Sequence, residues 1–299
     1  MTKKTRNWLI ALCILAFPFV LFSIFFFSRL ADIPPTPPPL PNPNGYDDLM
    51  KAGEMVAVES GDYDAMNAAQ LRELAGKNSA ALARARSGFS NECRVPIRFS
   101  TNYLDAHLED LAGLKRVAQG FIAKGRLAEM ESRPADAAQS FLDTIHLGNE
   151  LSRGGVLIDE LVGIAVKAMG TANLQTLVPR LDASTCRKTA AALETLDSEA
   201  ETLSTVMQEE NLWRKAFARL QKRSISQAED RSLKNIDAAC KRKLNIQEQK
   251  TRQLLIALAA RAYELDKGHP PTSTADLVPE YLKAVPQDPV SGTNMVYSP

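Results

Sequence analysis

The stretch FIAKGRLAEMESRPADAAQSF, residues 121–141, contains the pattern that decides the fold. Its first half places the small residues Gly125 and Ala128 one turn apart, and its second half opens with Pro134 and continues with Ala137. Small residues let two antiparallel helices approach closely, and proline fits the first turn of a helix because its missing amide donor would have no partner there. The sequence therefore predicts a helical hairpin.

The same stretch resembles one tetratricopeptide hairpin, because Gly125, Ala128, Ala137 and Phe141 match the small and aromatic positions of that pattern. The resemblance implies a pair of antiparallel helices. No second copy follows at the repeat period of about 34 residues, and a solenoid needs roughly three copies. The sequence favours an ordinary helical hairpin over a repeat array.

The residues before the hairpin predict shorter elements. A helical stretch begins at Tyr46 and runs through Val58, and Asp62 can cap a second helix. Pro96 disfavours helix at the residue before it, so residues 91–97 are expected to form a loop. From Asn102 a long helix resumes, with an apolar stripe at helical spacing formed by Leu104, Leu108, Leu111 and Ala118.

The residues after the hairpin predict further helices. The pair Gly154-Gly155 marks a turn, and the next helix ends near Pro179. One long or kinked helix is expected over 185–224 and another over 232–266. Two long charged helices in succession most often form an antiparallel hairpin, and a dimeric coiled coil is the alternative. The heptad spacing does not choose between them, so a homo-oligomer stays open.

Composition agrees with an all-α protein and argues against nucleic acid as a partner. The chain is 45% hydrophobic and 24% charged, as in a globular protein, and only 6% aromatic, which suits helices rich in Ala and Leu. Residues 33–299 hold 32 basic and 34 acidic side chains, a net charge near −2. Binding to a phosphate backbone needs a concentrated positive field, which this balance lacks.

Residues 8–27 decide where the protein is expected to lie. This stretch, Trp8 to Phe27, contains no charge, and twenty helical residues span the hydrocarbon core of a bilayer, which is about 30 Å thick. A cleaved signal peptide would have a shorter apolar region ending in small residues, whereas this one ends in three phenylalanines. Three basic residues precede the stretch, so the N-terminus is expected to be cytoplasmic and the C-terminal part periplasmic.

The expected organisation has five parts in chain order. Seven prolines between Ile33 and Asn44 forbid helix and sheet and predict an extended, semi-rigid spacer. The predicted parts are a cytoplasmic leader (1–7), a single-pass transmembrane signal-anchor helix (8–27), a proline-rich stalk (28–45), an exported multi-helix domain (46–253) and a short irregular or small-β tail (254–299).

Three cysteines, Cys93, Cys186 and Cys240, fall in the part expected to be exported, where disulfides can form. Cys93 lies in the proline-bearing loop and Cys186 near a helix start. A bridge between these two residues is therefore the favoured prediction. The alternative is that all three are buried thiols that pack as small hydrophobic groups.

The sequence contains no motif that assigns catalysis. His107, His146 and His269 are far apart, and none has the spacing that places two metal ligands on one helix face. His107 alternates with acidic residues and is expected on an exposed flank, whereas His146 adjoins apolar neighbours and is expected at a core edge. No nucleophile elbow, phosphate loop or calcium loop is present. We predict no catalytic, cofactor-binding or metal-binding residue, and an enzyme is unsupported.

The tail is the most distinctive stretch. An amphipathic helix leads to Tyr263, Gly268 and the pair Pro270-Pro271, and Asp288-Pro289 with Gly292 follows. This order resembles the C-terminal part of the major pseudopilins of type II secretion systems, over about 45 residues. The N-terminal leader and processing site of a pilin are missing, and no residue of the pseudopilin calcium site can be assigned. The alternative is that the tail simply packs on the helical domain.

The whole chain resembles bacterial single-pass envelope proteins of uncharacterised role that carry such a tail. We therefore predict an envelope scaffold or interaction protein, bound to the lipid bilayer through residues 8–27 and to protein partners in the envelope. The resemblance of the tail implies a second hypothesis, an association with type II secretion or pseudopilus assembly. A third hypothesis is an envelope hydrolase whose site is assembled from distant residues; a pocket that gathers a histidine and carboxylates would favour it.

Overall fold

The computed structural model describes residues 39–57, 63, 65–98, 100, 102–221 and 226–297. The predicted leader and transmembrane helix, and residues 28–38 of the predicted stalk, lie outside these ranges. Residues 39–43, the described part of the proline run, form neither helix nor strand, as the prolines predict.

The described part of the chain is all-α. It holds nine α-helices, two short 3₁₀ helices and no strand. The elements are α2 (Gly45–Met55), α3 (Ala68–Lys77), α4 (Ser79–Gly88), α5 (Tyr103–Met130), α6 (Pro134–Glu150), α7 (Leu157–Leu177), η1 (Val178–Arg180), α8 (Ala183–Ser198), α9 (Leu203–Leu220), α10 (Gln227–Lys267) and η2 (Thr274–Leu277).

The predicted hairpin is confirmed as α5 and α6. Pro134 occupies the first turn of α6. Gly125 lies against the ring of Phe141, and a Cβ at Gly125 would come within 2.3 Å of a ring carbon. The small residue therefore sets how closely the two helices pack, as the sequence predicts.

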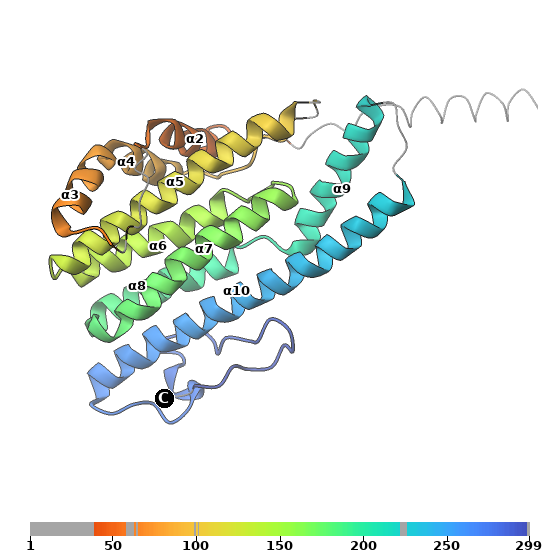
Figure 1. Ribbon diagram of the computed structural model, residues 1–299. Helices are drawn as coiled ribbons and strands as arrows, with labels where there is room; N and C mark the ends of the chain where they lie inside the picture. Colours follow the sequence, from red (N-terminus) through yellow and green to blue (C-terminus); the bar gives the residue numbers. More distant parts are fainter. Residues whose placement is uncertain are drawn as a thin grey trace, which may run out of the picture.

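The helices form a layered bundle. Figure 1 shows α5, α6 and α7 side by side, with α2 to α4 on the outer side of α5, and with α10 and the tail on the opposite side of the bundle. Helix α8 packs between α6 and α10. The hairpin of α5 and α6 thus lies at the centre of the molecule.

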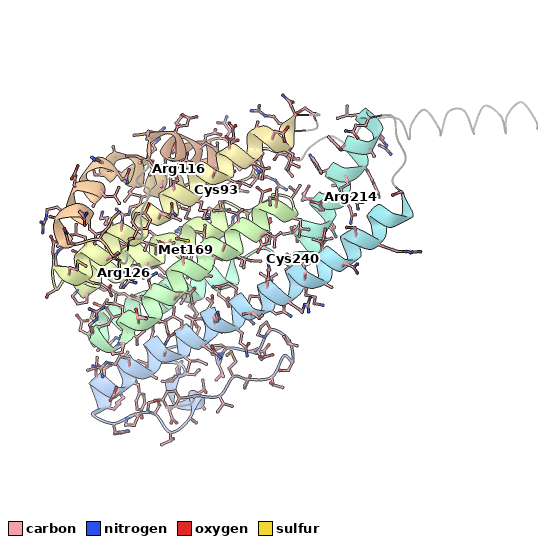
Figure 2. The ribbon with its side chains drawn as sticks, viewed as in Figure 1. Cys93, Arg116, Arg126, Met169, Arg214 and Cys240 are labelled. Atoms are coloured by element: carbon pink, nitrogen blue, oxygen red, sulfur yellow. The ribbon has the colours of Figure 1, made fainter. Side chains whose placement is uncertain are left out.

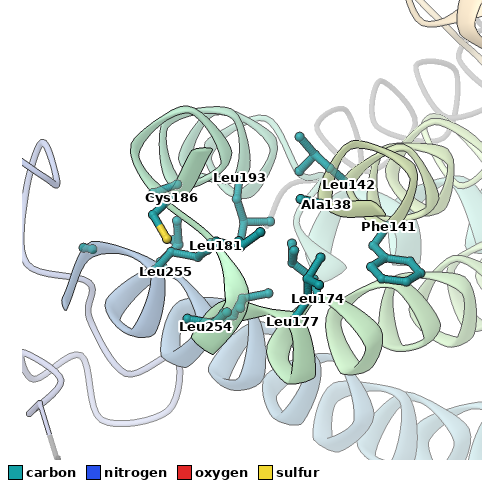
Figure 3. Packing of buried hydrophobic residues seen from close by; sticks show 14 of the residues in the cluster. Ala138, Phe141, Leu142, Leu174, Leu177, Leu181, Cys186, Leu193, Leu254 and Leu255 are labelled. Atoms are coloured by element: carbon teal, nitrogen blue, oxygen red, sulfur yellow. The ribbon is translucent and has the colours of Figure 1, made fainter. Parts of the chain in front are cut away.

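Two large hydrophobic clusters hold these layers together. One joins α6, α7, α8, α10 and the tail, and Figure 3 shows Phe141, Leu174, Leu193 and Leu254 meeting in it from four different helices. The other joins α2, α4, α5, α6 and α7. Burying a leucine or phenylalanine side chain contributes about 1.5–3 kcal/mol, so these contacts are the main source of stability.

Two sequence-based predictions about the helices are wrong in part. Of the stripe predicted on α5, Leu111 and Ala118 are buried, as expected. Leu104 and Leu108 are 39% and 44% exposed, and the first turns of α5 bury Tyr103 and His107 instead. The expected single helix over 185–224 is two helices, because Thr202 accepts a hydrogen bond from the amide of Thr205 and starts α9. The contact of His107 with buried Asp159 explains the first difference, and the capping residue Thr202 explains the second.

Helices α9 and α10 both pack against α7. A small cluster holds them there, formed by Leu157, Leu161, Ile164, Leu203, Met207, Cys240 and Leu244. In this arrangement Leu203, Met207, Cys240 and Leu244 of the two long helices pack against α7 of the same chain, so they are not available to a coiled coil between two chains. Oligomerisation remains a prediction.

Among the described residues, one helical stretch, Leu157–Arg180, is long and apolar enough to cross a membrane. Half of its most apolar window is buried inside the bundle. Because α7 packs against α5, α6 and α10, this stretch has the properties of the core helix of a globular domain.

The tail folds back onto α10. Gly268 ends the helix at a φ of +78°, and its amide donates to the carbonyl of Glu264 over 2.8 Å, so the predicted glycine cap is confirmed. A turn at Asp288 and Gly292 and an isolated bridge between Gln287 and Asn294 follow. The predicted boundary at 253/254 falls inside α10.

Candidate functional site

The predicted disulfide is not present. Cys93 lies in the cluster around α2 and α5, and Cys186 lies between α8 and α10 in the other cluster. Both are free, buried thiols, as is Cys240, and Figure 2 shows Cys93 and Cys240 in different layers of the bundle. Burial raises the pKa of the Cys186 and Cys240 thiols to about 11. All three pack as small hydrophobic groups.

His107 is buried and paired, not exposed as the sequence predicts. It is 3% exposed, and its Nε2 lies 2.5 Å from Oδ1 of Asp159, which is fully buried. The other carboxylate oxygen of Asp159 accepts the amide of Val156 and caps α7. Tyr103 stacks on His107 with ring centroids 4.9 Å apart. This pair joins α5 to α7 inside the bundle, and its closed surroundings indicate a structural role.

His146 lies at the edge of a groove, as predicted for a core-edge residue. The groove has a volume of about 560 Å³ and is framed by the loop after α4, by α6 and by α8. Its lining combines charged, polar and apolar side chains: Phe89, Asn91, Glu92, Gln139, Leu142, Asp143, His146, Glu150, Arg153, Ala192, Thr195, Leu196 and Glu199.

The floor of the groove is aromatic. Phe89 stacks on His146 with ring centroids 4.2 Å apart, and it also contacts Phe121 of the core, with ring centroids 6.3 Å apart. Burial lowers the pKa of His146, although the nearby Glu150 partly opposes this shift. The imidazole is therefore neutral at neutral pH, and the floor offers two uncharged rings.

Two of the four carboxylates that line the groove have internal partners. Glu150 accepts from Arg153 over 2.7 and 3.0 Å, and Asp143 accepts from Arg86 over 2.5 Å. Glu92 and Glu199 are exposed, and in the described part of the chain neither side chain forms an ion pair, although the charge of Arg153 acts on Glu199. Four carboxylates thus face two guanidinium groups, and two negative charges remain on the rim.

The groove also lies where three helices end. Helix α4 ends at Gly88 with Phe89 as its C-cap, α6 ends at Glu150 with Leu151, and α8 ends at Ser198 with Glu199. The C-terminus of a helix carries a partial negative charge of about half an elementary charge. Helix ends and rim carboxylates therefore give this part of the surface a negative potential.

The groove has some but not all of the parts of a hydrolytic site. Nε2 of His146 lies 3.7 Å from Oε1 of Glu150, which is outside hydrogen-bond distance. The one hydroxyl on the lining, that of Thr195, donates to the carbonyl of Ala191. The third histidine, His269, lies in the exposed turn after α10, and no cluster of metal-ligating residues occurs in the described ranges.

Sequence reasoning placed His146 correctly but did not find the groove. Its walls come from residues 89–92, 139–153 and 192–199, which are distant in sequence. The sequence indicates only where some of these helices end, as at the break Gly154-Gly155, and not that the ends meet in space. Comparison of the chain with protein-family models, with curated proteins and with solved structures finds no match.

Proposed function

We propose that this chain is a membrane-anchored envelope interaction protein. In this proposal residues 8–27 cross the inner membrane, the proline-rich stalk holds the helical domain away from the bilayer on the periplasmic side, and the groove beside His146 binds a partner protein. The uncharged stretch of twenty residues and the basic residues before it support the anchor and its orientation.

The groove is the observation that carries the proposal. It is open to solvent, its volume is in the range of ligand-binding clefts, and it combines an aromatic floor with a polar rim. Aromatic side chains inside a polar rim are typical of protein–protein contact sites. Its walls are helix ends fixed in two packed clusters, so the shape is formed before a partner arrives.

The orientation is tested with a reporter enzyme that is active only outside the cytoplasm, fused after Pro299. Activity of the fusion in intact cells is the expected result. The matched control replaces Lys3, Lys4 and Arg6 by glutamate, which removes the charge bias that orients the anchor and is expected to lower the activity. A second fusion carries, after Pro299, a fluorescent protein that folds only in the cytoplasm. Fluorescence of that fusion together with an inactive enzyme fusion would refute the orientation.

Partner binding is tested by photo-crosslinking in living cells. A crosslinking amino acid is placed at Glu92 or Thr195, on the rim of the groove, and at exposed Lys115 of α5 as the control. We expect one discrete crosslinked product from the rim positions and none from the control position. Equal products from all three positions would mean that the groove is not the contact site.

The tail supports a second candidate, a component associated with type II secretion. Leu277, Tyr281 and Leu282 are buried against α10, and the amide of Lys283 donates to Glu194 of α8. These contacts are also what a tail that only packs on its own domain would make. Co-purification of the full chain with a secretion apparatus would support this candidate, and loss of that association on deleting residues 284–299 would assign it to the tail.

The third candidate, an envelope hydrolase, is favoured by one observation, the histidine and carboxylates gathered around one groove. In such an enzyme His146 would activate water, because a neutral imidazole near physiological pH is a suitable general base. The test is hydrolysis of simple ester and amide substrates by the full chain. Turnover that His146→Gln abolishes while the fold remains intact would support it.

A further inference from the structure

We infer that the groove beside His146 recognises a basic protein segment, one that places an arginine or lysine side chain between Glu92 and Glu199. This inference rests on the proposed function, since it names the chemistry of the partner. Three features of the groove carry it: its net negative charge, the helix ends that meet there, and the arginine side chain that already occupies part of it.

The charge of the groove is negative in two ways. Glu92 and Glu199 line the groove from two different segments, one on the loop after α4 and the other at the end of α8, and neither forms an ion pair among the described residues. The charge of Arg153 acts on Glu199 but is shared with Glu150 and Glu201. The C-termini of α4, α6 and α8 add their partial negative charges at the same place. A positive group in the groove gains from both sources, and an acidic one is repelled by both.

Arg153 shows what the groove accepts. Its guanidinium donates two hydrogen bonds to Glu150 at the end of α6, and its Nη1 donates to the backbone carbonyl of Glu199 at the end of α8, over 3.3 Å. One cation of the chain thus already bridges two of the three helix ends. Glu92 and the end of α4 have no such cation among the described residues, and Glu199 shares Arg153 with Glu150, so the groove keeps a net negative charge for a second cation from a partner.

The floor suits the rest of a peptide. Phe89 and His146 present stacked rings, and Leu142, Ala192 and Leu196 are apolar. Arginine and lysine bury their aliphatic stems against such apolar surfaces while the charged group stays in water. A volume of about 560 Å³ exceeds that of a single guanidinium group, so the groove can hold several residues of an extended segment.

The experiment measures binding of fluorescent peptides to the full chain in detergent micelles by anisotropy. The probe is a seven-residue peptide with a central arginine between two leucines, and its matched versions carry lysine, norleucine or glutamate at the centre. We expect binding of the arginine and lysine peptides, weaker binding of the norleucine peptide and no binding of the glutamate peptide. Raising the salt concentration is expected to weaken binding, because the rim charges are exposed.

Charge variants locate the site. The double variant E92Q/E199Q is expected to weaken the affinity for the arginine peptide by roughly threefold to tenfold, since exposed ion pairs are individually weak. The matched control Glu109→Gln removes an exposed carboxylate of α5 outside the groove and is expected to leave binding unchanged. Glu199→Lys is expected to shift the preference toward the glutamate peptide.

Several outcomes would overturn the inference. Equal binding of the arginine and glutamate peptides, or an unchanged affinity in E92Q/E199Q, would show that charge at the rim does not select the ligand. Displacement of the peptide by spermidine at equal concentration would assign the groove to a free polyamine. If photo-crosslinking from Thr195 to a partner persists in E92Q/E199Q, the proposed function stands and this inference alone is refuted. If the basic peptide binds but no partner is crosslinked in cells, the proposed function is refuted and the preference of the groove for basic segments stands.

Discussion

The two histidines inside the bundle occupy opposite kinds of surroundings. His107 is enclosed between α5 and α7 and contacts a fully buried carboxylate, whereas His146 lies at the border of an open groove and has no hydrogen-bond partner among the nearby carboxylates. A charge removed from water must be paired, because leaving it unpaired costs several kcal/mol. The difference teaches that an enclosed polar side chain here joins two helices through its partner, whereas one at the border of the groove keeps polar atoms without such a partner.

The strongest test of this contrast is the buried pair. His107→Leu is expected to lower the free energy of unfolding by about 3–5 kcal/mol, because it leaves Asp159 buried without its partner. Denaturant unfolding of residues 39–299 measures the change. His269→Leu, at an exposed position, is the control and is expected to change stability by less than about 0.5 kcal/mol. Equal effects of the two substitutions would mean that the His107–Asp159 contact does not hold α5 to α7.

The ion pair of Arg86 and Asp143 is intermediate in burial between the enclosed His107–Asp159 pair and the exposed rim, because Asp143 lines the groove. Asp143 is 5% exposed, whereas the side chain of Arg86 is 34% exposed. Arg86→Met is expected to cost about 1–3 kcal/mol, since it leaves the carboxylate with only the amide of Gln139 as a donor. The double variant R86M/D143L is expected to recover part of the loss. A double variant as unstable as the single one would contradict this account.

His146 makes stability depend on pH. Burial lowers its pKa in the folded state, so the unfolded chain binds a proton more readily and acid favours unfolding. The stability that comes from burying a neutral imidazole is fully present above pH 6.5, the ordinary pKa of histidine. It is lost as the pH falls from 6.5 toward the lower pKa of the folded state. His146→Phe is expected to flatten the stability profile in this range while leaving stability at pH 8 little changed. A profile with the same slope in both proteins would show that His146 is not responsible.

The smallest effect on stability is expected at the rim of the groove. Glu199 is exposed at the C-terminus of α8, where a negative charge is unfavourable. Glu199→Gln is therefore expected to change the unfolding free energy by less than about 0.5 kcal/mol, toward greater stability. Thermal unfolding measures it, with Glu109→Gln as the matched exposed carboxylate. A clear loss of stability would show that Glu199 is part of the scaffold.

The fold was predictable where its signals are local. Pro134 and Gly268 lie within one turn of the helix ends that they determine, and Gly125 and Phe141 lie on the two consecutive helices of one hairpin. Each of these features occurs as predicted. The side-chain pair of His107 and Asp159 was not predictable, because 52 residues separate them and nothing near His107 indicates burial. In the first turns of α5 the buried side chains are therefore Tyr103 and His107 in place of Leu104 and Leu108, whereas Leu111 is buried as predicted.

The candidate site was less predictable than the fold. The groove depends on where three helix ends meet in space, and that follows from the packing of α6 and α8. The predicted bridge between Cys93 and Cys186 relied on compartment and on loop position. Each cysteine instead fills a different hydrophobic cluster.

Helix α10 runs without interruption over 41 residues, which corresponds to about 60 Å. One of its ends carries the tail, and Leu244 lies in the cluster with α7 and α9. A single continuous helix therefore contacts both the tail and the cluster with α7 and α9. A substitution that interrupts α10 between these two contacts would therefore separate the tail from that cluster without altering the α5–α6 hairpin directly.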